Sequence, residues 1–267
     1  MTMYWIYDFP NWELGVLTVV VFNVISILGL FTTRPFVRKL TNGSGEHNDL
    51  VSWFFAGVGV FYGLALGLIA VATWEDFTGV DAIVGKEATV LAAFYRDLDG
   101  YPADFRAKIE EQVRVYAKRI ITVEWPGHRQ GLTPEDGSVL LDKVENDLMA
   151  FEPRSERERI AHAEAIRSLD QLVEVRQSRL QSVGTGLPAS LWSVVIVGAI
   201  LNFALTYLFW IENLKLHAVL VAIFATFVAL LIFLTAAMDN PFRGEFSVSP
   251  DAFQAVIDSV MTPKPGQ

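Results

Sequence analysis

The chain has 267 residues, of which 52% are hydrophobic and 19% are charged, and its formal net charge is -9. Nucleic-acid phosphates require a basic protein face, so we expect no nucleic-acid partner for so acidic a chain. The sequence contains no cysteine, which excludes disulfides, thiolate metal sites and cysteine nucleophiles.

Four long apolar stretches, free of acidic and basic residues, divide the chain. Each has about the twenty residues that a helix needs to cross about 30 Å of hydrocarbon with its backbone groups bonded internally. A cleaved signal peptide is the alternative for the first stretch, but acidic residues precede it and basic ones follow it, which reverses a signal's charge order. We therefore predict an all-α integral membrane protein whose transmembrane helices cover residues 14–32, 51–74, 191–211 and 216–238.

The spacing of these stretches predicts four parts along the chain. Two membrane hairpins flank a polar segment, and that segment carries apolar residues at helical spacing, which predicts a helical extramembrane domain. Four helices are expected in it, and the last begins at Ser155 in a capping box with Glu158. The expected breaks between them are at Gly100 and Pro102, at Pro126 and Gly127, and at residues 152–153. The parts are residues 1–74, 75–187, 188–238 and a turn and tail at 239–267.

The second membrane stretch carries the candidate functional residues. Gly59, Gly63 and Gly67 are four residues apart, a spacing that lets another helix approach closely in lipid. Trp53 and Phe61 lie about 12 Å apart along the helix axis. Around an oligomer axis such aromatic side chains would form a hydrophobic constriction; the alternative is that they face lipid.

No ionisable group interrupts the apolar stretches except His217 at one end. A coupled transporter usually needs such a group to bind its coupling ion, so a passive pore is favoured over an active transporter. The four histidines are scattered, and no phosphate loop, nucleophile elbow or metal-binding spacing occurs. We expect no enzyme activity.

The stretch after the last membrane helix holds three carboxylates within a Pro- and Gly-containing turn. Asp239, Glu245 and Asp251 could converge on a hard cation such as Ca²⁺. The alternative is that Asp239 and Asn240 only cap a helix end. We expect no other cofactor.

Several short segments resemble the bestrophin-like membrane proteins of bacteria and plants, and the resemblance covers nearly the whole chain. More distantly, the chain is similar to the bestrophin chloride channels. The segments that carry the resemblance are residues 61–63, 70–77, 124–126, 187–188, 191–192, 239–242 and Phe253.

This resemblance implies a pentamer in which the second membrane helix of each subunit lines the pore. Phe61 and Tyr62 match the aromatic pair of the bestrophin neck, whereas Gly57 stands where that family has a further aromatic residue. Residues 240–242 match the start of the bestrophin calcium clasp, but the acidic run that follows there is missing. The candidate pore residues are thus Trp53, Gly57, Phe61 and Tyr62.

Four crossings put both termini and the polar domain on one side of the membrane. Lys and Arg residues near the membrane ends are equal in number on the two sides, although their density after the first helix favours cytoplasmic short loops. The resemblance instead implies a cytosolic domain, which we adopt, in a bacterial inner membrane.

Our hypothesis is a homo-oligomeric passive ion channel for anions, with the lipid bilayer, other copies of the chain and permeating ions as its partners. The alternative is a non-conducting adaptor or sensor whose helical domain binds a partner. Residues 75–187 contain 21 acidic and 15 basic residues, a net charge of -6 that would concentrate cations in any vestibule that the segment lined.

Overall fold

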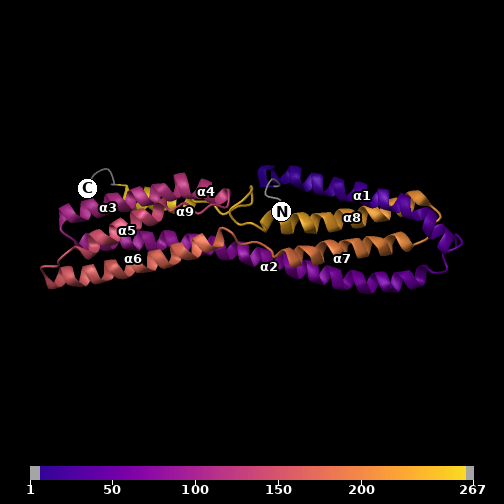
Figure 1. Cartoon of the computed structure of the whole chain (residues 1–267), viewed down its shortest axis with the longest axis horizontal. Coiled ribbons are helices and arrows are strands. Elements are labelled where there is room, and N and C mark those ends of the chain that lie inside the picture. The colour runs from indigo at the N-terminus through magenta and orange to yellow at the C-terminus, as the bar shows by residue number, and fades with distance from the viewer. Residues whose placement is uncertain (1–6, 263–267) are drawn as a thin grey trace. The chain divides into compact units, whose positions relative to one another are not determined.

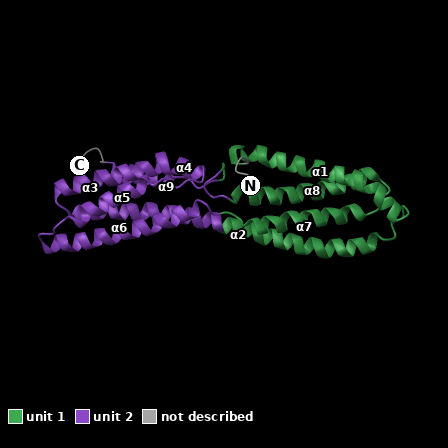
Figure 2. Ribbon diagram, viewed as in Figure 1, with its two compact units in different colours: residues 1–75, 186–239, 244–246 green, residues 76–185, 240–243, 247–267 purple. Residues whose placement is uncertain are grey.

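The computed structural model describes residues 7–262, and every regular element in that range is helical. The chain forms two compact units (Figure 2). Unit 1 comprises the described residues up to Glu75, together with Gly186–Asp239 and Gly244–Phe246. Unit 2 comprises Asp76–Thr185, Asn240–Arg243 and the described residues from Ser247 onward. Helix α2 (Asn48–Asp97) is a single helix of 50 residues that belongs to both (Figure 1).

Unit 1 consists of four helices that are long and apolar enough to cross a membrane, as the sequence predicts. These are α1 (Asn11–Leu40), the first part of α2, α7 (Ala189–Leu208) and α8 (Leu214–Met238). The first helix is longer than the predicted span of residues 14–32, because α1 begins at Asn11 and continues through Pro35 to Leu40. Proline removes one backbone donor, and membrane helices tolerate that loss.

Two kinds of contact hold the helices of unit 1 together. Small and branched side chains from α2, α7 and α8 form its apolar core, which includes Leu66, Val195, Ala199, Phe203, Ala225, Val228 and Ile232. Helix α1 is linked to α8 by a hydrogen bond of 3.0 Å from Asn23 Nδ2 to Thr226 Oγ1. A polar side chain in hydrocarbon is stabilised by such an interhelical bond.

A glycine lets α2 and α7 approach each other closely. The ring of Tyr62 on α2 lies against Gly198 on α7, where a Cβ atom would overlap Cδ2 and Cε2 of the ring. The Tyr62 hydroxyl also donates a hydrogen bond of 3.2 Å to the carbonyl oxygen of Val195. Any side chain larger than hydrogen at position 198 would therefore push the two helices apart.

The loops at one end of unit 1 are tied together by polar side chains. Arg34 Nη2 donates to the carbonyl oxygens of Ile211 and Glu212, and its guanidinium lies 4.7 Å from the Trp210 ring centroid. Asn48 bonds both the N–H and the carbonyl oxygen of Trp210. Side chains of α1 and α2 thus bond free backbone groups of the α7–α8 connection.

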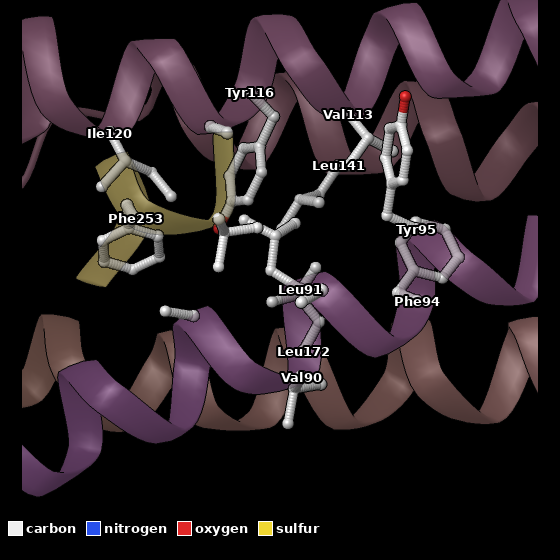
Figure 3. Close-up of a cluster of buried hydrophobic side chains, with 14 of the residues drawn as sticks. Val90, Leu91, Phe94, Tyr95, Val113, Tyr116, Ile120, Leu141, Leu172 and Phe253 are labelled. Atoms are coloured by element: carbon white, nitrogen blue, oxygen red, sulfur yellow. The ribbon is translucent and has the colours of Figure 1, made fainter. Parts of the chain in front are cut away.

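Unit 2 is a bundle built on the second part of α2. Its other elements are η2 (Leu98–Gly100), α3 (Ala103–Arg119), the π-helical turn η3 (Ile120–Glu124), α4 (Trp125–Arg129), α5 (Asp136–Met149), α6 (Glu156–Ser182), α9 (Asp251–Val256) and the π-helical turn η4 (Ile257–Met261). Figure 3 shows the core of this unit, in which Leu91, Phe94, Tyr116, Leu172 and Phe253 come from α2, α3, α6 and α9. The C-terminal segment is therefore part of the bundle.

The predicted helix boundaries of unit 2 are partly confirmed. Ser155 caps α6, because its Oγ accepts a hydrogen bond of 3.2 Å from the N–H of Glu158. The predicted break at Pro126 is wrong, since the chain stays helical through α4 to Arg129. Proline is compatible with a first helical turn, where its missing N–H has no intrahelical partner.

We predict that Gly198→Ala destabilises unit 1 by about 1–3 kcal/mol, because the added methyl group overlaps the Tyr62 ring in a packed core. Thermal unfolding of the protein purified in detergent measures the loss. Gly184→Ala is the control, since its Cβ meets no atom within 4 Å. Equal melting temperatures for the two variants would contradict the predicted overlap.

Candidate pore-lining face of helix α2

Helix α2 is the least covered of the four membrane helices. In its most apolar stretch 6% of the residues are buried, compared with 17% in α1, 28% in α7 and 33% in α8. Leu66 is buried in the core that α2 forms with α7 and α8, and the other buried positions between residues 51 and 74 are Val51 and Thr73. The rest of this stretch therefore presents a large surface that no other helix of the chain covers.

Three of the predicted pore residues lie on this open surface. The side chain of Trp53 is 81% exposed and that of Phe61 is 76% exposed. A Cβ atom added at Gly57 would meet nothing within 4 Å. At 100° per residue these three positions and the exposed Leu64 and Leu68 fall within one side of the helix. This set, Trp53, Gly57, Phe61, Leu64 and Leu68, is the open face of α2.

Tyr62 is not part of the open face, which corrects the predicted aromatic pair. It lies one residue after Phe61 and so points about 100° away around the helix. Its ring contacts Gly198 and its hydroxyl bonds Val195, both on α7. Tyr62 packs α2 against its own chain, and Phe61 alone of the pair faces outward.

The predicted glycine seam is only partly used within the chain. Gly59 faces α7, where an added Cβ would lie 3.7 Å from Asn202 Oδ1. Gly63 and Gly67 have open space on the Cβ side. Two glycines thus leave a shallow, unfilled strip beside the open face, of the kind that allows close helix approach in lipid.

Each of the three candidate metal ligands accepts a hydrogen bond. Asp239 accepts hydrogen bonds from Leu187 N at 2.5 Å and from Trp192 Nε1 at 3.2 Å. Glu245 accepts one from Asn11 N at 2.8 Å, and Asp251 one from Ser249 Oγ at 2.7 Å. No group of three acidic or histidine residues among residues 7–262 is arranged to hold a metal ion. A calcium site at Asp239, Glu245 and Asp251 stays a prediction.

Comparison with known proteins identifies the family. The model of the Bestrophin-like domain matches residues 20–253. The chain belongs to the Bestrophin-like family. No curated protein sequence matches it.

Solved structures share the fold of this Bestrophin-like chain. A bacterial bestrophin homologue from Klebsiella pneumoniae superposes with a TM-score of 0.67 at 14% identity, and the match covers 93% of this chain and 99% of the other. A single-substitution variant of a bacterial bestrophin homologue from the same organism gives 0.65 at 16% identity, over 94% and 99% of the two chains. Identities this low show a common fold and leave the activity of this chain to its own residues.

A buried network of charged side chains in unit 2 escaped the sequence analysis of this Bestrophin-like chain. Arg179 on α6 donates from Nε to Glu87 Oε2 at 2.6 Å and from Nη2 to Glu124 Oε2 at 2.7 Å. Arg176 donates from Nη2 to Glu124 Oε1 at 2.6 Å. All four side chains are buried, and their formal charges balance. Removing one partner of such a pair leaves an uncompensated buried charge, which is strongly destabilising.

Neighbouring groups extend this network. Tyr116 donates a hydrogen bond of 3.2 Å to Glu87 Oε1, and His128 Nε2 contacts Arg179 Nη1. His128 Nδ1 also bonds the carbonyl oxygen of Leu132 at 3.0 Å. The network therefore joins α2, α3, η3, α4 and α6, and it fixes the part of α2 that lies in unit 2.

Burial and mutual charge set the protonation of the network. Burial by itself would raise the pKa of the Glu124 carboxyl, but Arg179 and Arg176 outweigh it and hold that pKa below its usual value. Burial and the positive charge of Arg179 lower the pKa of His128 to about 4. The Glu124 carboxylate thus stays ionised beside the arginines, while the His128 imidazole stays neutral near neutral pH.

The sequence did hold a signal for this network. Arg176 and Arg179 fall in the helical phase of the apolar residues Leu169, Leu172 and Val175, so they lie on the inward side of α6. Arginines in phase with an apolar stripe, together with two acidic residues in apolar segments elsewhere, indicate a buried pair.

We predict that unit 2 loses stability as the pH falls from about 6.5 to about 4. The folded-state pKa of His128 lies below the unfolded value of 6.5, so the histidine of the unfolded chain takes up a proton at a higher pH than that of the folded chain. The free energy of unfolding therefore falls by about 3 kcal/mol across this window. Thermal unfolding at a series of pH values measures it. A His128→Gln variant is expected to show a flatter profile, and an unchanged slope would contradict the role of this histidine.

Proposed function

We propose that this protein is a homo-oligomeric passive ion channel whose conduction path is lined by the open face of α2. The observation that carries the proposal is the combination of bulky aromatic side chains and glycine on one uncovered side of a spanning helix. Lipid alone does not require the unfilled strip at Gly63 and Gly67, whereas a second copy of the helix fits it by close backbone approach. A pentamer with anion permeation is the arrangement that the bestrophin resemblance favours.

The open face suits a hydrophobic neck. Most of the surface of Trp53 and of Phe61 is exposed. Gly57, which lies between them along the helix and has no side chain, would leave a wider section of the pore. Rings of apolar side chains around a narrow pore gate by dewetting, without any charged group in the membrane. The spans contain no Asp, Glu, Lys or Arg in their apolar cores, which supports passive permeation over ion-coupled transport.

The likeness to bacterial bestrophin structures supports a cytosolic position for unit 2 and the two termini. A plasma membrane is then the location that fits the proposal. A non-conducting adaptor is the competing function, and the first experiment below decides between the two.

We predict that the purified protein conducts ions in planar bilayers and that Phe61→Ala raises the single-channel conductance at least about twofold, because removing the ring widens the neck and eases its wetting. Phe227→Ala is the matched control, since Phe227 is an exposed aromatic residue on α8 and is expected to face lipid. If the wild type carries no current, the channel proposal is wrong. If both variants behave alike, Phe61 does not form the neck.

We predict that Gly63→Leu removes the oligomer while the protomer stays folded, because the added side chain has open space in its own chain and fills the strip that a second copy would occupy. Native mass spectrometry in detergent measures the subunit number. Ala204→Leu, at an exposed position on α7, is the control and should leave the subunit number unchanged. An oligomer that survives Gly63→Leu would contradict packing through this strip.

A further inference from the structure

The outward side of α2 in unit 2 has a charge opposite to the average charge of the domain around it. Residues 75–187 are acidic on average, but two of the acidic side chains on α2 are turned inward. Glu87 is bound by Arg179 in the buried network, and Asp97 accepts a hydrogen bond of 2.6 Å from Ser168 Oγ. The average charge of the segment therefore does not describe the outward side of this helix.

The outward side of α2 in unit 2 is small, polar and basic. Its exposed residues at helical spacing are Thr78, Ala82, Lys86, Thr89, Ala93 and Arg96. Asp76 and Asp81 are also exposed, but each lies about 100° or more around the helix from the midline between Lys86 and Arg96. Among residues 7–262, no acidic side chain forms an ion pair with Lys86 or Arg96.

The basic strip and the open face belong to the same helix, α2. Leu64 and Ala82 are 18 positions apart in the sequence, which equals five helical turns, so the two residues share one line in helical phase. Glu75 is in phase with this line as well, and it is engaged in an interaction. Between Glu75 and the end of α2, the charged residues close to this line are Lys86 and Arg96.

We propose that Lys86 and Arg96 select anions in the conduction path. This inference rests on the proposed channel, because the strip lines a path only if copies of α2 surround it. Each positive charge within about 8 Å of a permeating ion enriches a monovalent anion about twofold in water, and the copies in an oligomer multiply the effect. The acidic residues elsewhere in unit 2 lie outside this strip and have less influence on the permeating ion.

The test is the ratio of chloride to potassium permeability of the full-length protein in planar bilayers under a KCl gradient. The variants are Lys86→Gln, Arg96→Gln and the double substitution. Lys143→Gln on α5 and Arg157→Gln on α6 are matched controls, because both residues are exposed away from α2. All four substituted side chains are exposed, so thermal unfolding should report unchanged folding.

We expect the wild type to prefer chloride and the double variant to lose at least about threefold of that preference, with each single variant between them. The two control variants should have the permeability ratio of the wild type. The difference in permeability ratio between the wild type and the double variant should shrink at about 1 M salt, where the Debye length is about 3 Å. A current with the same permeability ratio in all variants, or a wild type that prefers potassium, overturns the assignment of Lys86 and Arg96 alone. A wild type without current overturns the channel itself and this assignment with it.

Discussion

Coverage of α2 from one side only is the constraint on which the rest of this structure depends. In the hydrocarbon layer each helix satisfies its own backbone, so packing between spans is decided by how closely side chains allow them to approach. On its inner side α2 achieves this through Tyr62 against Gly198. On its outer side the chain supplies aromatic residues and glycines with nothing of its own to cover them.

In unit 2, buried ion pairs hold the other part of α2 in place. There Glu87 is fixed by Arg179, and Glu124 is shared between Arg179 and Arg176. Charged groups removed from water are stable only when their partners are well placed and their remaining bonding positions are filled. Such a network gives little tolerance for rotation of α2, so the side of the helix that faces outward is fixed by the groups that face inward.

The charge at the outward side of α2 in unit 2 differs from the average charge of the whole polar segment. A net charge of -6 over residues 75–187 says little about a surface formed by one side of one helix, because burial and ion pairing remove some acidic groups from it. Interactions between charges in water weaken over about a Debye length. The few residues in line with Lys86 and Arg96 therefore outweigh the composition of the whole segment at that surface.

The sequence by itself determined the four membrane helices, the helical nature of the polar segment and the cap at Ser155. These features follow from local properties, namely apolar length, helical spacing and a side chain that bonds a backbone group three residues away. The sequence also placed Trp53, Gly57 and Phe61 together, since positions three or four residues apart share a side of a helix.

Only the tertiary structure decided which side of each helix is covered. It separated Tyr62 from Phe61, and it joined Glu87 and Glu124 to arginines more than fifty residues away. The physical reason is that a helix has the same local hydrogen bonds whichever way it is rotated. The rotation is fixed by partners distant in the chain, through a close contact at Gly198 in unit 1 and through paired charges in unit 2.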